Sequence, residues 1–147
     1  IIGMPSASQH KRYKIRSKQS GLYSIFADGS DASSEKITLR KLDDLILEEG
    51  ITNIDFIKID VEGAEYSVLK GANTAIEKFH PILQIELNSM GSTLSGIHSF
   101  DVLNLLQKNS YKIFTFIDND LIKIEDSELQ HYLKKDDFHL EIIAIYE

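Results

Sequence analysis

A chain of 147 residues fits a single domain, since a domain of about 150 residues buries roughly 70% of the surface of its unfolded chain. Its 42% hydrophobic and 27% charged residues are typical of a globular protein and argue against extensive disorder, collagen or coiled coil. The 16 basic and 23 acidic side chains give a net charge of −7, which argues against nucleic acid as a partner. The chain has no cysteine, and its apolar runs are far shorter than the ~20 residues of a membrane span. We therefore expect a cytoplasmic protein without disulfides, thiolate metal sites or a membrane span.

The first 35 residues are predicted to form a hairpin followed by a polar loop. Basic residues alternate with Tyr13 and Ile15 between positions 10 and 18, and Ser20 and Gly21 interrupt the chain before an apolar run at 22–26. The basic cluster is either a solvated strand face, which we favour, or a contact for an anionic ligand. Residues 27–35 are rich in Ser, Asp and Gly, which is typical of a linker or a lid. Ser20 and Gly21 are candidate substrate contacts.

Residues 36–147 are predicted to form an α/β core in which strands and helices alternate. Gly50 and Gly71 are expected to end helices, and Pro81 stops helical continuation before the next strand. The run at 54–61 is apolar nearly throughout, which suits a strand covered by helices on both faces of a parallel sheet. The expected strands are 36–40, 54–61, 82–87, 111–117, 121–124 and 138–146; the expected helices are 42–50, 64–70, 73–79, 99–109 and 127–134; and 88–98 is expected to be a Gly/Ser-rich loop.

This order of elements predicts one open α/β sheet, mostly parallel with an antiparallel terminal strand. The segment 54–87 is a β-α-β unit, whose crossover is expected to be right-handed. In such sheets ligands bind beyond the carboxyl ends of the parallel strands. The ends of strands 54–61 and 82–87 are therefore the place to look for chemistry.

Acidic side chains stand at the ends of these two strands. If the strands are neighbours, Asp60 and Glu86 both reach the carboxyl edge, and Lys58 lies close enough to offset one of their charges. The alternative is structural, with Lys58 contacting Glu86 and Asp60 capping the following turn, and the spacing leaves both open. Asp60, Glu86 and Asn88 would also suit magnesium or calcium, although the spacing does not require a metal.

Further candidates lie in the turns that follow these strands. Glu62 and Glu65 flank a helix start, where carboxylates serve as caps or complement the helix dipole. Gly63 suits a tight turn that needs a positive φ or a close backbone approach to a ligand. Asn88 and His98 are candidate substrate contacts, and His98 is otherwise a general base or a surface residue. The sequence contains no GxGxxG, GxxxxGKS/T, GxSxG or HxxxH motif, so it offers no recognisable nucleotide cradle, hydrolase elbow or zinc site.

The string IDFIKIDVEGAEYSVLKGA at residues 54–72 resembles the signature of the FkbM family of S-adenosylmethionine-dependent methyltransferases. Two further strings resemble family segments: ITLRKLDDLI at 37–46, and ILQIEL at 82–87, which follows Pro81. The resemblance runs from about residue 20 to the end and weakens after residue 90. It implies a seven-stranded Rossmann-like sheet in which 54–60 and 82–87 are the fourth and fifth strands, and 111–117 and 138–146 the final antiparallel pair.

By this resemblance the chain is the carboxyl-terminal two-thirds of one catalytic domain, without the first strands and the glycine-rich cofactor turn. The resemblance implies S-adenosylmethionine as cofactor and O-methyl transfer to a hydroxyl of a sugar, glycan or natural product, with the need for a divalent metal left open. Asp60, Glu62 and Glu86 carry over as residues lining the active-site edge, and Gly63 and Glu65 as residues shaping the turn. We expect the 147-residue chain alone to be inactive, to bind no cofactor and to self-associate through an open sheet edge.

Two other classes of protein are alternatives. A non-catalytic methyltransferase-like module would bind a glycan through the 88–98 loop and the basic hairpin. A receiver-like domain with Asp60 as phosphoacceptor is less favoured, because it needs a further acidic pair on an earlier strand and a lysine on a later one. Glycan-array binding without cofactor would favour the first alternative, and phosphoryl-donor labelling the second.

Overall fold

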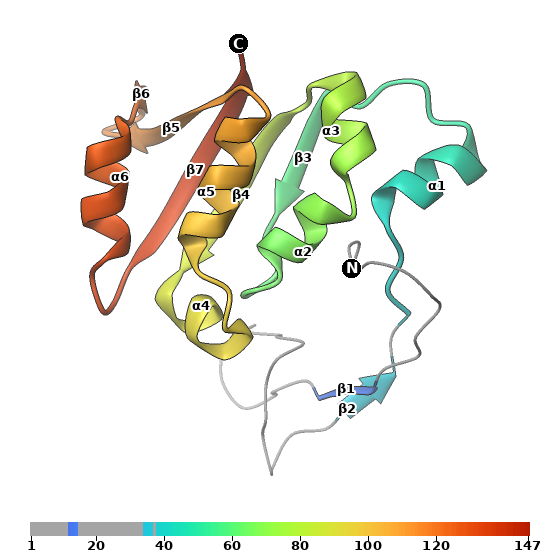
Figure 1. Ribbon diagram of the computed structural model, residues 1–147, viewed down its shortest axis with the longest axis horizontal. Helices are drawn as coiled ribbons and strands as arrows, with labels where there is room; N and C mark the ends of the chain where they lie inside the picture. Colours follow the sequence, from blue (N-terminus) through green and yellow to red (C-terminus); the bar gives the residue numbers. More distant parts are fainter. Residues whose placement is uncertain (1–11, 15–33, 37) are drawn as a thin grey trace.

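The computed structural model describes residues 12–14, 34–36 and 38–147, which form an α/β fold (Figure 1). Most of the helices and strands expected from the sequence are present within one or two residues of their expected bounds. In chain order the elements are β1 (Arg12–Lys14), β2 (Ser34–Lys36), α1 (Leu42–Glu49), β3 (Phe56–Ile59), α2 (Glu65–Lys70), α3 (Asn73–Phe79), β4 (Ile82–Asn88), α4 (Ser89–Ser95), α5 (Ser99–Lys108), β5 (Tyr111–Ile117), β6 (Asp120–Lys123), α6 (Asp126–Leu133) and β7 (His139–Tyr146).

The main sheet has five strands in the order β3-β4-β7-β5-β6. Among these described strands, β3 and β4 pair in parallel, and the three other neighbouring pairs are antiparallel. The predicted mostly parallel sheet is therefore corrected to a mixed one. The reason is that β7 returns between β4 and β5, and that β5 and β6 form a hairpin around Asp118 and Asn119, both with positive φ. The expected antiparallel pairing of the last long strand with 111–117 is confirmed.

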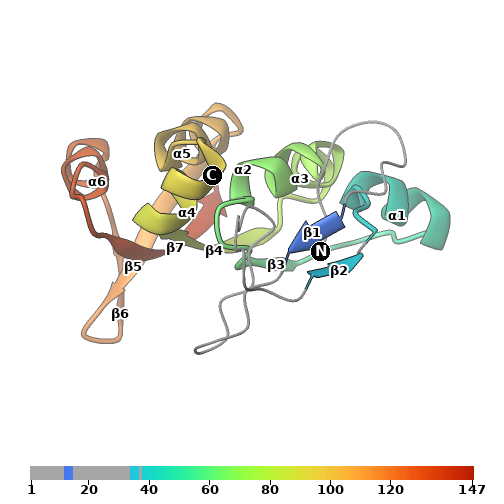
Figure 2. The same ribbon diagram turned by 90° about the horizontal axis from the view of Figure 1, so that it is seen from below.

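Helices α2, α3, α5 and α6 lie on the same side of this sheet (Figure 2). Under them the sheet presents an apolar core in which Leu83, Ile85 and Ile142 have no exposed surface. The prediction that strand 54–61 is covered on both faces is wrong for the described residues. It is shorter, at Phe56–Ile59, lies at the edge of the sheet, and leaves Phe56 51% exposed on the face opposite to these helices.

Two helix ends follow the expected glycine rule. Gly50 lies just beyond α1 with φ of 63°, in the left-handed conformation that a glycine adopts without steric cost. Gly71 follows the last residue of α2, and α3 starts two residues later at Asn73. The α2-α3 pair is therefore a broken helix whose two parts both pack on the sheet and connect β3 to β4.

The segment 88–98 contains a helix that the sequence analysis placed in a loop. Helix α4 follows β4 directly, because the Asn88 side chain accepts a hydrogen bond from the backbone N–H of Gly91 and caps the first turn. Gly96, with φ of 70°, follows its last residue. The expected loop is therefore a short capped helix at the end of β4.

The amino-terminal expectations are only partly covered by the described residues. Strand β1 pairs antiparallel with β2, so that Arg12 lies opposite Lys36, and the predicted strand at 36–40 is displaced to Ser34–Lys36. The predicted run at 22–26 and the candidate substrate contacts Ser20 and Gly21 lie outside the described residues. In the part of the chain that is described, no helix is long and apolar enough to cross a membrane.

Candidate active-site rim

The ends of β3 and β4 bring three carboxylates together. The parallel register pairs Ile59 with Ile85, so Asp60 and Glu86 follow at matching positions on adjacent strands. Oxygen atoms of Asp60, Glu62 and Glu86 all lie within 4.8 Å of one another. We call these three residues the acidic rim. The expectation that Asp60 and Glu86 meet at the carboxyl edge of the sheet is confirmed.

Each of the two strand carboxylates of the acidic rim faces a cationic or ionisable partner. Lys58 Nζ lies 3.2 Å from Asp60 Oδ2, and His139 Nε2 lies 3.4 Å from Glu86 Oε1. The alternative contact between Lys58 and Glu86 is replaced by these two. Because the Asp60 side chain is 40% exposed and that of Glu86 21%, solvent screens both pairs, and they offset charge more than they add stability.

Glu62 is held by the start of α4. Its backbone has φ of 51°, a conformation that residues other than glycine rarely adopt. Asn88 Nδ2 donates a hydrogen bond of 3.0 Å to Glu62 Oε2, while Asn88 Oδ1 accepts the N–H of Gly91. A single amide side chain therefore links the turn after β3 to the helix after β4. The role of Asn88 as a substrate contact stays a prediction.

Two glycines allow these segments to approach closely. Gly63 has φ of 103°, and a Cβ added to it would lie 2.5 Å from the carbonyl oxygen of Gly91. A Cβ added to Gly91 would lie 2.7 Å from the backbone nitrogen of Gly63. The expectation that Gly63 needs a positive φ is confirmed, and its close approach is to the backbone of Gly91.

Glu65, the first residue of α2, is not part of the acidic rim. It is only 7% exposed, and its Oε1 accepts a 2.9 Å hydrogen bond from the backbone N–H of Gly63. Burial raises the pKa of the Glu65 carboxyl, while hydrogen bonds from the backbone of the turn oppose the shift. Its contact with Gly63 fits the expectation that Glu65 shapes this turn.

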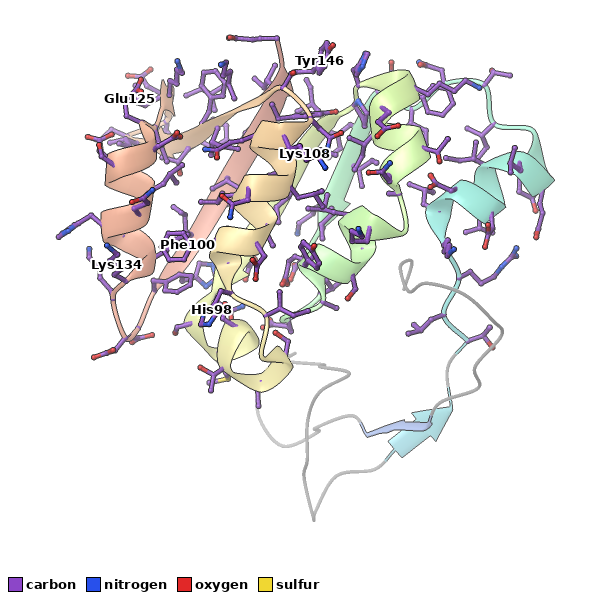
Figure 3. All side chains as sticks on the ribbon, in the orientation of Figure 1. His98, Phe100, Lys108, Glu125, Lys134 and Tyr146 are labelled. Carbon is purple, nitrogen blue, oxygen red and sulfur yellow. The ribbon has the colours of Figure 1, made fainter. Side chains whose placement is uncertain are left out.

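The histidine at the acidic rim is His139, whereas the candidate from the sequence was His98. His98 is exposed at the N-cap position of α5, beside α4 (Figure 3), and is not part of the acidic rim. His139, which the analysis did not single out, is the histidine that faces Glu86. Its position follows from the register that pairs β7 with β4, and no local pattern in the sequence predicts that register. Gly91 was missed too, although an Asn three residues before it is a usual helix cap.

The acidic rim can bind a cation or accept protons. Three carboxylates against one lysine and one histidine leave the rim acidic, which favours positively charged groups and hydroxyl donors. Oxygen ligands of this kind also suit a hard divalent ion. Asp60, Glu62 and Glu86 would supply these ligands, although exposed acidic groups are common without a metal.

The acidic side chains lie at the carboxyl ends of neighbouring parallel strands, which is where open α/β sheets bind their ligands. The particular family follows from comparison: the model of the methyltransferase FkbM domain matches residues 2–113, more than half of the chain. The chain belongs to the FkbM methyltransferase family. The matched span includes the whole acidic rim and ends within β5. Comparison with curated proteins and with solved structures finds no match.

Proposed function

We propose that the protein is a methyltransferase that uses S-adenosylmethionine and methylates a hydroxyl oxygen of a sugar, glycan or natural product at the acidic rim. The observation that carries the proposal is the position of the rim. Asp60, Glu62 and Glu86 stand within 4.8 Å of one another, inside the span that matches the FkbM domain. A carboxylate at the carboxyl end of a parallel strand is well placed to orient an acceptor hydroxyl and to take its proton.

The order of the strands supports a Rossmann-like sheet. The resemblance places 54–60, 82–87 and a final antiparallel pair side by side in such a sheet. Strands β3, β4, β7 and β5 are neighbours in that order, with β7 antiparallel to both β4 and β5. We infer that the described sheet is the carboxyl-terminal part of a Rossmann-like methyltransferase domain.

The described residues fit only one side of the reaction. The acidic rim suits the acceptor, but no glycine-rich turn that could cradle a nucleotide-bearing donor occurs in the sequence. We therefore assign to this chain the acceptor side alone, and no step is attributed to the donor. On the acceptor side, Asp60 lies nearest the reacting oxygen, and Asn88 and Gly91 hold Glu62 in place beside it.

Lys58 and His139 orient the carboxylates of Asp60 and Glu86. Lys58 Nζ donates a hydrogen bond of 3.2 Å to Asp60 Oδ2, and His139 Nε2 lies 3.4 Å from Glu86 Oε1. These two contacts hold the strand carboxylates of the acidic rim beside each other, where an acceptor hydroxyl could meet them.

The experiment is methyl transfer by the full-length gene product to a panel of hydroxyl acceptors. Asp60→Asn should lower the transfer rate by about 10²-fold or more, because the amide cannot take a proton. Asp55→Asn, an exposed carboxylate before the opposite end of β3, is the matched control and should leave the rate unchanged. Undiminished transfer by Asp60→Asn would refute its assignment, and a preference for nitrogen acceptors would refute O-methylation.

Calorimetry with S-adenosylmethionine on the 147-residue chain tests the division between donor and acceptor sides. We expect no measurable binding. Micromolar affinity would contradict the division, because the donor site would then lie within these residues. Glycan binding by the full-length protein without any methyl transfer would favour the non-catalytic module instead.

A further inference from the structure

A second hollow lies at the other end of the sheet. It is a cavity of about 550 Å³ between β5, β6, α6 and β7, lined by residues 115–117, 122–124 and 139–141 with Glu128, Leu129 and Tyr132. Figure 1 shows α6 beside the β5–β6 hairpin at this end of the sheet. All of these residues follow position 113, where the match to the FkbM domain ends. Family membership therefore assigns nothing to this cavity, which we call the split-sheet cavity.

The split-sheet cavity lies beside α6, at the place where the pairing between β5 and β7 ends. Consecutive residues of a strand point to opposite faces, yet all of 115–117 and all of 139–141 border the cavity. The ladder between β5 and β7 ends at the pair Phe114 and Ile143. Beyond that pair the two strands diverge, and the cavity occupies the wedge between them.

Two backbone carbonyls of β7 that border the cavity accept hydrogen bonds from side chains. Thr115 Oγ1 donates a 2.8 Å hydrogen bond to the carbonyl oxygen of Glu141, and Tyr132 Oη donates a 3.0 Å hydrogen bond to that of His139. In a continued ladder these carbonyls would bond to β5. Because hydroxyls replace those bonds, the wedge stays open without leaving these two carbonyls unpaired, which would otherwise be costly.

The lining of the split-sheet cavity is mainly apolar and leaves large side chains in water. Phe116, Ile117 and Ile122 are 55%, 54% and 43% exposed, and all three border the cavity. Leaving such side chains exposed forgoes part of the free energy that their burial would provide. An occupant that covers them would gain this free energy.

The charges of the lining disfavour an anion. Lys123 is the one lysine among the lining residues, against the carboxylates of Glu128 and Glu141, and its Nζ already faces Glu125 at 3.8 Å. A volume of about 550 Å³ is within the range of small-molecule pockets, roughly 300–1,000 Å³. The chemistry of the lining therefore suits a small, mainly apolar molecule without a negative charge.

We propose that the split-sheet cavity is a binding site for a small, mainly apolar molecule without a negative charge. The site is separate from the acidic rim, and its occupancy does not depend on methyl transfer. His139 borders the cavity through β7 and also faces Glu86 at 3.4 Å, so an occupant lies one residue away from the rim.

Two matched probes test the proposal in a fluorine NMR titration of the full-length protein. They are 4-(trifluoromethyl)benzyl alcohol, which is neutral, and 4-(trifluoromethyl)benzoate, which has the same body and a negative charge. We expect saturable binding of the alcohol and at least about fivefold weaker binding of the benzoate, because burying an unpaired charge is unfavourable. No donor is present, so the result is independent of the proposed methyl transfer.

Ile122→Trp fills the split-sheet cavity from β6 and should weaken binding of the alcohol by about tenfold, which corresponds to ~1.4 kcal/mol. Ile117→Trp fills it from β5 and should do the same. The matched control is Leu47→Trp on α1, where the side chain is 82% exposed, and it should bind like wild type. Circular dichroism of each variant checks that it is folded.

Absence of saturable binding would overturn the proposal. So would equal affinity for the alcohol and the benzoate, or wild-type affinity in both filled variants. Weaker binding in both filled variants, with the control unchanged, would place the probe in the split-sheet cavity.

Discussion

The acidic rim and the split-sheet cavity are built in opposite ways. At the rim, backbone segments touch through two glycines, and an amide side chain ties them together. At the cavity, two strands part and large apolar side chains stay half exposed. Close packing holds the rim residues in one arrangement, whereas the cavity walls retain space. The comparison predicts that small changes are felt strongly at the rim and weakly at the cavity.

The largest effect is expected from Gly63→Ala. The new methyl group would meet the Gly91 carbonyl at 2.5 Å in a backbone conformation with φ of 103°, so neither space nor dihedral angle suits it. We expect a loss of about 3 kcal/mol or more in the free energy of unfolding, measured by urea denaturation. Gly96→Ala is the matched control: it has φ of 70° but nothing within 4 Å, and should cost only about 1 kcal/mol. Equal losses in the two variants would contradict the close approach.

Asn88→Ala should have the next largest effect. It removes both the cap of α4 and the hydrogen bond to Glu62, and we expect a loss of about 2 kcal/mol in unfolding free energy. Asn73→Ala, which removes an exposed hydrogen bond to Glu77, should cost less than about 0.5 kcal/mol. Amide exchange in α4 should accelerate in Asn88→Ala alone. Unchanged exchange there would show that the cap does not hold the helix.

At the split-sheet cavity, Thr115→Val leaves the shape of the side chain nearly unchanged and removes the hydroxyl that bonds the Glu141 carbonyl. Because water can reach the wedge and replace that bond, we expect a loss of about 1 kcal/mol at most. Thermal unfolding compared with the exposed control Thr52→Val measures it. A loss as large as that of Gly63→Ala would mean that the cavity is as tightly built as the rim.

We expect the smallest effect from Glu65, whose ionisation makes the free energy of unfolding depend on pH. Burial raises the pKa of Glu65 above its usual value of 4.5, so its protonated form is favoured in the folded state. The contribution of Glu65 to stability is therefore fully present below pH 4.5 and is lost as pH rises through the folded-state pKa. Glu65→Gln keeps an acceptor for Gly63 without the ionisation and should flatten this part of the profile. Urea titrations of both proteins over acidic to neutral pH check it, and identical profiles would contradict the raised pKa.

The sequence predicted those parts of the fold whose information is local. The apolar runs that form β3, β4, β5 and β7 marked strands, and glycines marked helix ends. Parallel pairing of the first two strands then followed from the crossover length, and it brought Asp60 and Glu86 together. Contacts between segments that are close in the sequence could therefore be predicted from the sequence alone.

The rest depends on how distant segments meet. His139 faces Glu86 because β7 pairs with β4, and the cavity exists because the pairing between β5 and β7 ends at Phe114. No local sequence pattern predicts the register of either pair. Helix α4 was missed because its sequence, rich in Ser and Gly, has low helix propensity, which the cap by Asn88 overrides. The one-sided helix layer was missed because an apolar strand looks the same whether one or both of its faces are covered.

The position of β7 in the sheet has a consequence for synthesis of the protein. This strand, the last of the described elements, lies between β4 and β5 and supplies the buried Ile142 and Ala144. Until the ribosome has released residues 139–146, no strand pairs with both β4 and β5. The apolar side chains that will pack against β7 then stay exposed to water. Such long-range pairing is slow to form. A nascent chain stalled before this strand should therefore be a substrate for chaperones and proteases, and folding should complete only when the strand arrives.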